Sequence, residues 1–208
     1  MKRSVSKLNS KLFLVLYLVV VVIILVLWMS RLDIAQPDRR VIPESLKPIL
    51  ISPPKALPQF ILTTDSGGLL TNTSVMERWS FVYFTHPNCQ PDCSIVYSVL
   101  ENLKELFASQ STQFFLVNFM SSEKESVFSS SLSVYSASKK VLQPVMASFN
   151  FLYIDPKDYG DTDKVEQQQY IYLIDPRGRA YAVFKPPFSS FFIQKQFFEL
   201  RRFYALTE

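Results

Sequence analysis

The sequence predicts one α/β domain behind an apolar N-terminal helix, and three observations lead to this prediction. Residues 12–29 form an apolar run without a single charged side chain. Residues 81–84 are all apolar or aromatic, which is typical of a buried strand. From Ser94 onward, apolar residues recur every three or four positions, the period of one helix face. The loop between this strand and this helix contains both cysteines and the only histidine of the chain.

The apolar run has the features of an uncleaved transmembrane anchor. Residues 12–29 are long enough to cross a bilayer core as a helix. The tail before them, residues 1–11, contains four basic residues and no acidic one, which places it in the cytoplasm. Residues 30–33 are a poor cleavage site for a signal peptidase. We therefore expect the rest of the chain to lie outside the cytoplasm.

The segment after the anchor is expected to be a spacer. Residues 30–56 are polar and contain closely spaced prolines, a composition that favours a semi-rigid, extended tether. The globular domain is expected over residues 57–208. Beyond the tail, the chain has 18 basic and 18 acidic residues, so the formal net charge of +4 comes from the tail. This balance excludes the basic footprint of a nucleic-acid-binding protein and leaves the membrane as the expected partner of the tail and anchor.

The sequence predicts a defined order of strands and helices for the domain. Turn residues and apolar periodicity predict first a hairpin, then a strand, a helix and a strand that form a parallel pair, and finally a second hairpin and a helix. This is the order of a thioredoxin-like fold, a central mixed sheet flanked by helices. The predicted elements are strands at 59–62, 69–70, 81–84, 114–119, 132–135, 151–154, 170–174 and 180–184, and helices from 94, from 143 or 144 to about 150, and over 189–206.

Cys89 and Cys93 are the candidate functional residues. They lie at a predicted helix start, where unpaired backbone N–H groups and the helix dipole favour a thiolate. Two sulfurs at this spacing can close a disulfide or hold a soft metal ion together. Copper(I) suits two thiolates, whereas a tetrahedral zinc site needs two further Cys or His ligands. Spacing alone leaves a structural disulfide, a redox pair and a copper site open.

Several motifs narrow the choice between a structural disulfide, a redox pair and a copper site. They resemble those of the SCO/SenC family of membrane-anchored copper and thiol proteins, and the resemblance covers roughly residues 54–206. The resemblance implies a thioredoxin fold with inserted elements and a copper site made of two cysteines and a histidine. It also implies a role in building the dinuclear copper centre of cytochrome c oxidase, by delivering copper or by keeping the receiving cysteines reduced. The matching residues are Pro58-Gln59-Phe60-x-Leu62, Trp79-Ser80, Phe84-Thr85-His86, Cys89-x-x-x-Cys93, Val165-Glu166-Gln167 and Tyr172-Leu173-Ile174-Asp175-Pro176-Arg177-Gly178.

Carried over residue by residue, the resemblance gives two of the three copper ligands. Cys89 and Cys93 match the thiolate ligands, whereas the position of the ligand histidine is occupied by Gln167. A carboxamide oxygen is a poor ligand for soft copper(I). His86 is the one histidine available as a substitute third ligand, and its alternative role is that of a hydrogen-bonded structural residue. The chain is thus expected to be a divergent member.

Three functions follow. In the first, the chain is a metallochaperone that holds Cu(I) between Cys89 and Cys93 and passes it to the copper-centre subunit of the oxidase or to another assembly factor. In the second, it is a thiol-disulfide oxidoreductase that no longer binds copper, with Cys89 attacking and Cys93 resolving. In the third, it is a non-catalytic tethered module with a structural disulfide.

The copper-linked assembly role is the expectation taken forward, with thiol exchange as the alternative. The short basic tail lacks the Arg- and Ser-rich character of a mitochondrial presequence. We therefore expect a bacterial inner-membrane protein whose domain lies in the periplasm. The alternative location is the mitochondrial inner membrane, with the domain facing the intermembrane space.

Overall fold

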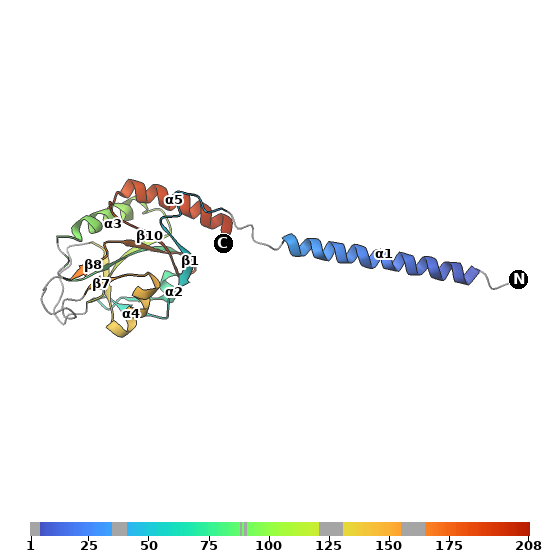
Figure 1. The fold of residues 1–208 in the computed structure, drawn as a ribbon. Coiled ribbons are helices and arrows are strands. Elements are labelled where there is room, and N and C mark those ends of the chain that lie inside the picture. The colour runs from blue at the N-terminus through green and yellow to red at the C-terminus, as the bar shows by residue number, and fades with distance from the viewer. Residues whose placement is uncertain (1–4, 35–40, 88, 90, 121–130, 155–164) are drawn as a thin grey trace. The chain divides into compact units, whose positions relative to one another are not determined.

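A computed structural model describes residues 5–34, 41–87, 89, 91–120, 131–154 and 165–208 (Figure 1). The chain divides into two compact units. The first comprises Met1–Ile42 with Phe203–Glu208, and the second comprises Pro43–Arg202. Residues 1–4 of the expected tail and 35–40 of the expected tether lie outside the described residues.

The first unit contains a long helix, α1 (Val5–Ile34), which includes the predicted apolar run. Its side chains are described over residues 12–28, where all are apolar or aromatic and nearly all are exposed, from 46% at Val20 to 73% at Leu12. Within the part of the chain that the structure describes, no helix has both the length and the apolar character to cross a membrane.

The second unit is built on a mixed sheet of eight strands, as predicted for an α/β domain. The strand order is β1-β10-β9-β4-β5-β6-β2-β3, with β4, β5 and β6 parallel and the other pairs antiparallel. A separate pair, β7 and β8, is antiparallel. The strands are β1 (Leu50–Ala56), β2 (Ile61–Thr63), β3 (Leu69–Thr71), β4 (Trp79–Thr85), β5 (Thr112–Asn118), β6 (Ser133–Ser136), β7 (Tyr153–Ile154), β8 (Glu166–Gln167), β9 (Ile171–Ile174) and β10 (Arg179–Phe184).

The central unit of the sheet is β4, α3 (Ser94–Leu106) and β5, in the predicted strand, helix and strand order. Every residue of β4 is buried, because β9 and β5 pair with its two edges and helices cover both faces of the sheet. The two predicted hairpins are confirmed as β2–β3 and β9–β10. In the turns of these two hairpins, Gly67 (φ +84°) and Gly178 (φ +74°) adopt the left-handed conformation that glycine accommodates without strain.

The sheet begins earlier in the chain than the expected domain start at Leu57. Residues 50–56, expected in the tether, form β1 and pair with β10 at the edge of the sheet. An edge strand tolerates proline because one side of its backbone has no ladder partner. Pro53 and Pro54 also lie where the register between β1 and β10 shifts. Proline content was therefore a poor guide to this boundary.

Helix α4 (Lys139–Ser148) also differs from the prediction, because it starts before Pro144 instead of at it. Proline inside a helix removes one backbone hydrogen bond, and this loss is offset here by packing. Leu142, Val145 and Met146 on one face of α4 are all buried in the core. The last helix, α5 (Ser190–Thr207), is confirmed close to its predicted bounds, and a single helical turn, α2 (Asn72–Val75), follows β3.

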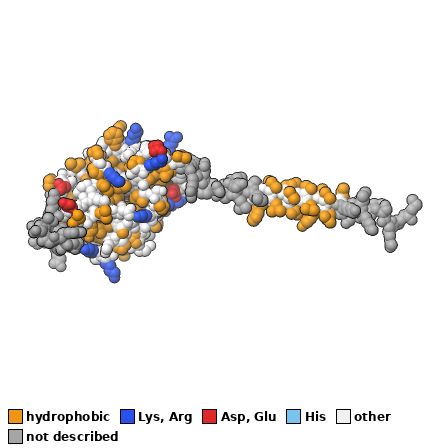
Figure 2. Space-filling view, viewed as in Figure 1, with side chains coloured by type: hydrophobic (Ala, Val, Ile, Leu, Met, Phe, Trp, Pro, Cys, Tyr) orange, Lys and Arg blue, Asp and Glu red, His pale blue; other side chains and the backbone are white. Residues whose placement is uncertain are grey.

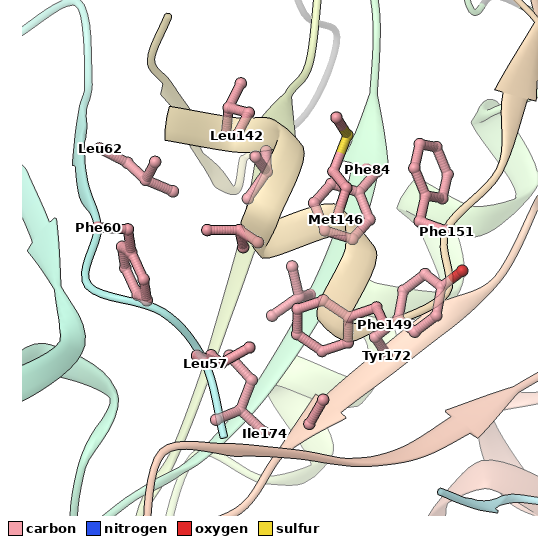
Figure 3. Packing of buried hydrophobic residues seen from close by; sticks show 14 of the residues in the cluster. Leu57, Phe60, Leu62, Phe84, Leu142, Met146, Phe149, Phe151, Tyr172 and Ile174 are labelled. Carbon is pink, nitrogen blue, oxygen red and sulfur yellow. The ribbon is translucent and has the colours of Figure 1, made fainter. Parts of the chain in front are cut away.

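Two apolar cores lie on opposite faces of the sheet. On one face, α4 packs over a cluster in which Phe84 contacts the rings of Phe149, Phe151 and Tyr172 (Figure 3). Residues of β4 alternate between the faces, so Phe81 points to the other side. There Phe81 stacks against Phe114 and lies close to the rings of Phe107, at the end of α3, and Phe197, from α5.

Replacing Phe84 by alanine should lower the free energy of unfolding by about 3–5 kcal/mol, because the ring is fully buried and its removal leaves a cavity. Leu152→Ala, at a residue that is 65% exposed, is the control and should change it by less than about 0.5 kcal/mol. Urea unfolding followed by the fluorescence of buried Trp79 measures both. Equal effects of the two substitutions would contradict this account of the core.

Candidate functional site

The cysteine pair lies in the loop between β4 and α3, as the sequence predicts. The N–H of Cys89 donates to the carbonyl of His86 (3.1 Å), and the N–H of Cys93 donates to the carbonyl of Cys89 (3.1 Å). Cys93 is the N-cap residue of α3, and its carbonyl accepts from the N–H of Tyr97 (3.0 Å). The loop thus turns tightly and holds the two Cα atoms 5.5 Å apart, joined by a disulfide.

The two sulfurs are not equivalent in their access to solvent. Cys93 is completely buried, whereas Cys89 is 4% exposed and lines a cleft of about 270 Å³. The Cys89 side is therefore the more accessible side of the pair. The remaining residues of the cleft wall are His86, Asp92, Val165, Glu166, Gln167 and Gln169.

A tyrosine hydroxyl lies next to the two sulfurs of the pair. The Tyr83 oxygen is 2.9 Å from the Cys93 sulfur and 3.9 Å from the Cys89 sulfur. Gln167 donates to this oxygen through Nε2 (2.8 Å), and the hydroxyl in turn donates to Oε1 of Gln169. Burial, together with nearby Tyr97, raises the pKa of Tyr83 well above its usual range. The group therefore remains a neutral hydroxyl, whose single proton can be donated either to Gln169 or to a sulfur.

Gln167, at the position expected for a third copper ligand, does lie next to the pair. Its Nε2 is 3.8 Å from the Cys93 sulfur, but this nitrogen is a donor, bonded to the Phe84 carbonyl (3.0 Å) as well as to Tyr83. An amide N–H has no lone pair for a metal. The other amide atom, Oε1, is buried without a hydrogen-bond partner in the described structure, and it is a hard oxygen that suits copper(I) poorly.

His86, the other candidate for a third ligand, is buried and packs edge-on against Phe119, with ring centroids 5.8 Å apart. Burial lowers the pKa of His86, and the opposing effect of Asp92 is smaller, so the imidazole is neutral at pH 7. It shares the cleft wall with Cys89. Across the described ranges, however, no three His, Cys, Asp or Glu side chains are grouped so that they could hold a metal ion. Copper ligation by these residues stays a prediction.

Tyr83 and Gln169 are the site residues that sequence reasoning missed. A tyrosine inside a fully buried strand needs a partner for its hydroxyl, and this requirement was the available signal. Gln169 lies two residues after Gln167, so an extended backbone sends both side chains to the same side. Nothing local in the sequence links residues 167–169 to β4, because the contact is long-range.

Comparison with known proteins finds solved structures that share the fold of this domain. No family model matches the chain, and no curated protein matches its sequence. Solved structures do match. Yeast Sco1 with copper bound aligns with a TM-score of 0.58 at 15% identity, covering 70% of this chain and 88% of that chain. An SCO1/SenC family lipoprotein from Bacillus anthracis aligns with a TM-score of 0.58 at 15% identity, covering 73% and 99%.

The domain has the fold of the SCO/SenC proteins. A third match, BsSco, described as a member of the Sco family of cytochrome c oxidase assembly proteins with a disulfide switch, gives a TM-score of 0.50 at 15% identity over 63% of this chain and 83% of that chain. The expected thioredoxin-like architecture is thereby confirmed for the SCO-like domain. At these identities the likeness establishes the fold, and the roles of Cys89 and Cys93 rest on their own geometry.

Replacing Tyr83 by phenylalanine should make the reduction potential of the pair more negative by about 30 mV, because a hydrogen bond to a charged sulfur contributes roughly 1.5 kcal/mol and only the reduced state contains a thiolate. Equilibration of the protein with thiol-disulfide buffers measures the potential.

Tyr97→Phe is the matched control, since the Tyr97 hydroxyl contacts Thr85 and not a sulfur. A potential that moves equally in both variants, or in neither, would show that the Tyr83 hydroxyl does not stabilise the thiolate.

Proposed function

We propose that this chain is a membrane-anchored, SCO-like thiol-disulfide exchange protein that helps to assemble the copper centre of cytochrome c oxidase. The observation that carries the proposal is the asymmetry of the cysteine pair. Cys89, 4% exposed, lines a cleft, whereas Cys93 is completely buried beside the hydroxyl of Tyr83. An attacking sulfur must be reachable and a resolving sulfur need not be, so this arrangement suits a dithiol that exchanges with a partner protein.

The reaction balances with the two cysteines alone. In the reduced protein, the Cys89 thiolate attacks one sulfur of a partner disulfide, which forms a mixed disulfide and releases one partner thiolate. The Cys93 thiolate then attacks the Cys89 sulfur, which closes the Cys89–Cys93 disulfide and releases the second partner thiolate. Two electrons pass to the partner, whose thiolates take up the protons lost by the cysteines. An external dithiol protein must reduce the pair again.

The assembly role is supported by the comparisons, since BsSco belongs to a family of cytochrome c oxidase assembly proteins. The partner proposed for the exchange is accordingly the copper-centre subunit of an oxidase, or another assembly factor. An oxidised cysteine pair also suits a compartment outside the cytoplasm, where disulfides persist. We place the domain in the bacterial periplasm and propose the apolar run of residues 12–29 as its membrane anchor, because lipid would cover the exposed apolar side chains of residues 12–28.

Copper(I) carriage is the second candidate function, and the copper-bound structure of yeast Sco1 favours it. Once reduced, Cys89 and Cys93 would hold the ion as cargo between two thiolates. The Gln167 Nε2, 3.8 Å from the Cys93 sulfur, donates its two hydrogens to the Tyr83 hydroxyl and the Phe84 carbonyl, so it is a hydrogen-bond donor and not a metal ligand. The side chains present thus fit thiol exchange better than they fit a three-ligand copper site.

A trapping experiment tests the proposed exchange. Reduced Cys93→Ser protein, mixed with a peptide that carries an intramolecular disulfide, should accumulate a covalent adduct on Cys89, because the resolving thiol is missing. Cys89→Ser is the matched control and should form at least about tenfold less adduct, since Cys93 is completely buried and does not line the cleft. Mass spectrometry of the unreduced mixtures measures both.

Equal adduct formation by the two variants would contradict the assigned roles of attacking and resolving cysteine. If neither variant forms an adduct and wild-type protein leaves the peptide oxidised, the disulfide is structural.

A further inference from the structure

Helix α5 presents an exposed face on which phenylalanines alternate with basic residues. Phe191, Lys195, Phe198 and Arg202 are spaced by four, three and four positions, so they lie on one face of the helix. The opposite face, with Ile193, Phe197 and Leu200, is buried against the sheet. Figure 2 shows orange and blue side chains, with red ones among them, along the edge of the domain where α5 lies in Figure 1.

The phenylalanines on this face are unusual for the domain. Phe191 is 66% exposed, Phe198 is 43% exposed, and the neighbouring Phe192 is 64% exposed. Within the described residues of the domain, every exposed phenylalanine lies on α5, whereas the remaining ones are buried or half-buried. Isolated apolar side chains at a surface need no explanation, but three large rings gathered on one helix indicate a surface that something covers.

The charges on the same face indicate what covers it. Lys195 and Arg202 have no acidic partner among the described residues. The nearest carboxylate along the helix, Glu199, lies four residues after Lys195 and three before Arg202, but it is half-buried, accepts a hydrogen bond from Ser45 and forms no ion pair with either cation among the described residues. A face of rings and uncompensated cations complements the boundary between acyl chains and anionic lipid headgroups.

We propose that α5 docks the domain onto an anionic lipid bilayer, with Phe191, Phe192 and Phe198 inserted at the headgroup boundary and Lys195 and Arg202 pairing with lipid phosphates. The occupant is a lipid surface, because long basic side chains can extend to headgroups while rings beside them enter the apolar layer. This inference rests on the membrane anchoring proposed above. It adds a second contact that would hold the cysteine cleft in a restricted orientation toward a membrane-bound partner.

Tryptophan fluorescence in full-length protein tests the docking. Trp28→Phe removes the one tryptophan of the anchor and leaves buried Trp79 as an internal reference. Into this background we introduce Phe191→Trp or, as the matched control, Leu152→Trp. Leu152 is 65% exposed, almost the same as Phe191, and comes four residues after the end of α4, a helix on the opposite face of the sheet from α5. Each variant is reconstituted into vesicles with about one-third phosphatidylglycerol, with and without brominated acyl chains.

Brominated lipid should quench the probe at position 191 at least about twofold and leave the probe at position 152 nearly unchanged, because bromine quenches only groups that reach the acyl chains. Adding Lys195→Gln and Arg202→Gln, or using vesicles without anionic lipid, should reverse most of this quenching. The double variant and the vesicles without anionic lipid both test the contribution of charge to docking separately from that of the phenylalanine rings.

Co-flotation of the protein with the vesicles separates the possible failures. If the protein floats but the two probes are quenched equally, the anchor stands and the docking of α5 is wrong. If the protein does not float, the anchor proposal fails and the docking that rests on it fails too, whereas thiol exchange is tested independently by trapping. A probe at position 191 that is insensitive to lipid and becomes buried as protein concentration rises would assign the face to a second copy of the chain and overturn lipid docking.

Discussion

The contact between the Tyr83 hydroxyl and the Cys93 sulfur is the constraint on which the site depends. Strand β4 is buried along its whole length, so Tyr83 cannot shift without breaking its pairing with β5 and β9. Helix α3 packs over the same strand, with the ring of Tyr97 against that of Tyr83, and has Cys93 as its N-cap residue. The hydroxyl oxygen therefore lies next to the buried sulfur; it accepts a hydrogen bond from Gln167, and its single proton is shared between Gln169 and the sulfur as alternative acceptors. The Cys93 sulfur is therefore fixed beside the hydroxyl, whereas Cys89 lines the cleft.

Most of the fold could be predicted because its central elements have strong local signals. The buried run of β4, the helical period of α3 and the Asp175–Gly178 turn between β9 and β10 each specify their own structure. The errors lie where proline suggested a break. Pro53 and Pro54 are accommodated in the edge strand β1, and Pro144 lies inside α4, because tertiary packing outweighs local preference at both places.

The site was predictable only in part. The location of Cys89 and Cys93 at a strand-to-helix turn followed from local pattern, and family resemblance indicated Gln167 as a neighbour of the pair. The Tyr83 hydroxyl and its bond to Gln169 join residues far apart in the chain, and no local periodicity encodes such a contact. The direction of the Gln167 amide, which decides between ligand and donor, depends on the Phe84 carbonyl and thus on the folded structure.

The central claim is that the pair is a redox couple without a third metal ligand, and an anaerobic copper(I) titration of the reduced protein against a competing chelator tests it most directly. The account predicts that wild-type protein loses copper(I) to the chelator, whereas Gln167→His protein retains it, since an imidazole supplies the missing nitrogen ligand. Cys89→Ser added to Gln167→His should abolish that retention. Tight one-to-one binding by wild-type protein, dependent on both cysteines and no weaker than in Gln167→His, would contradict the account.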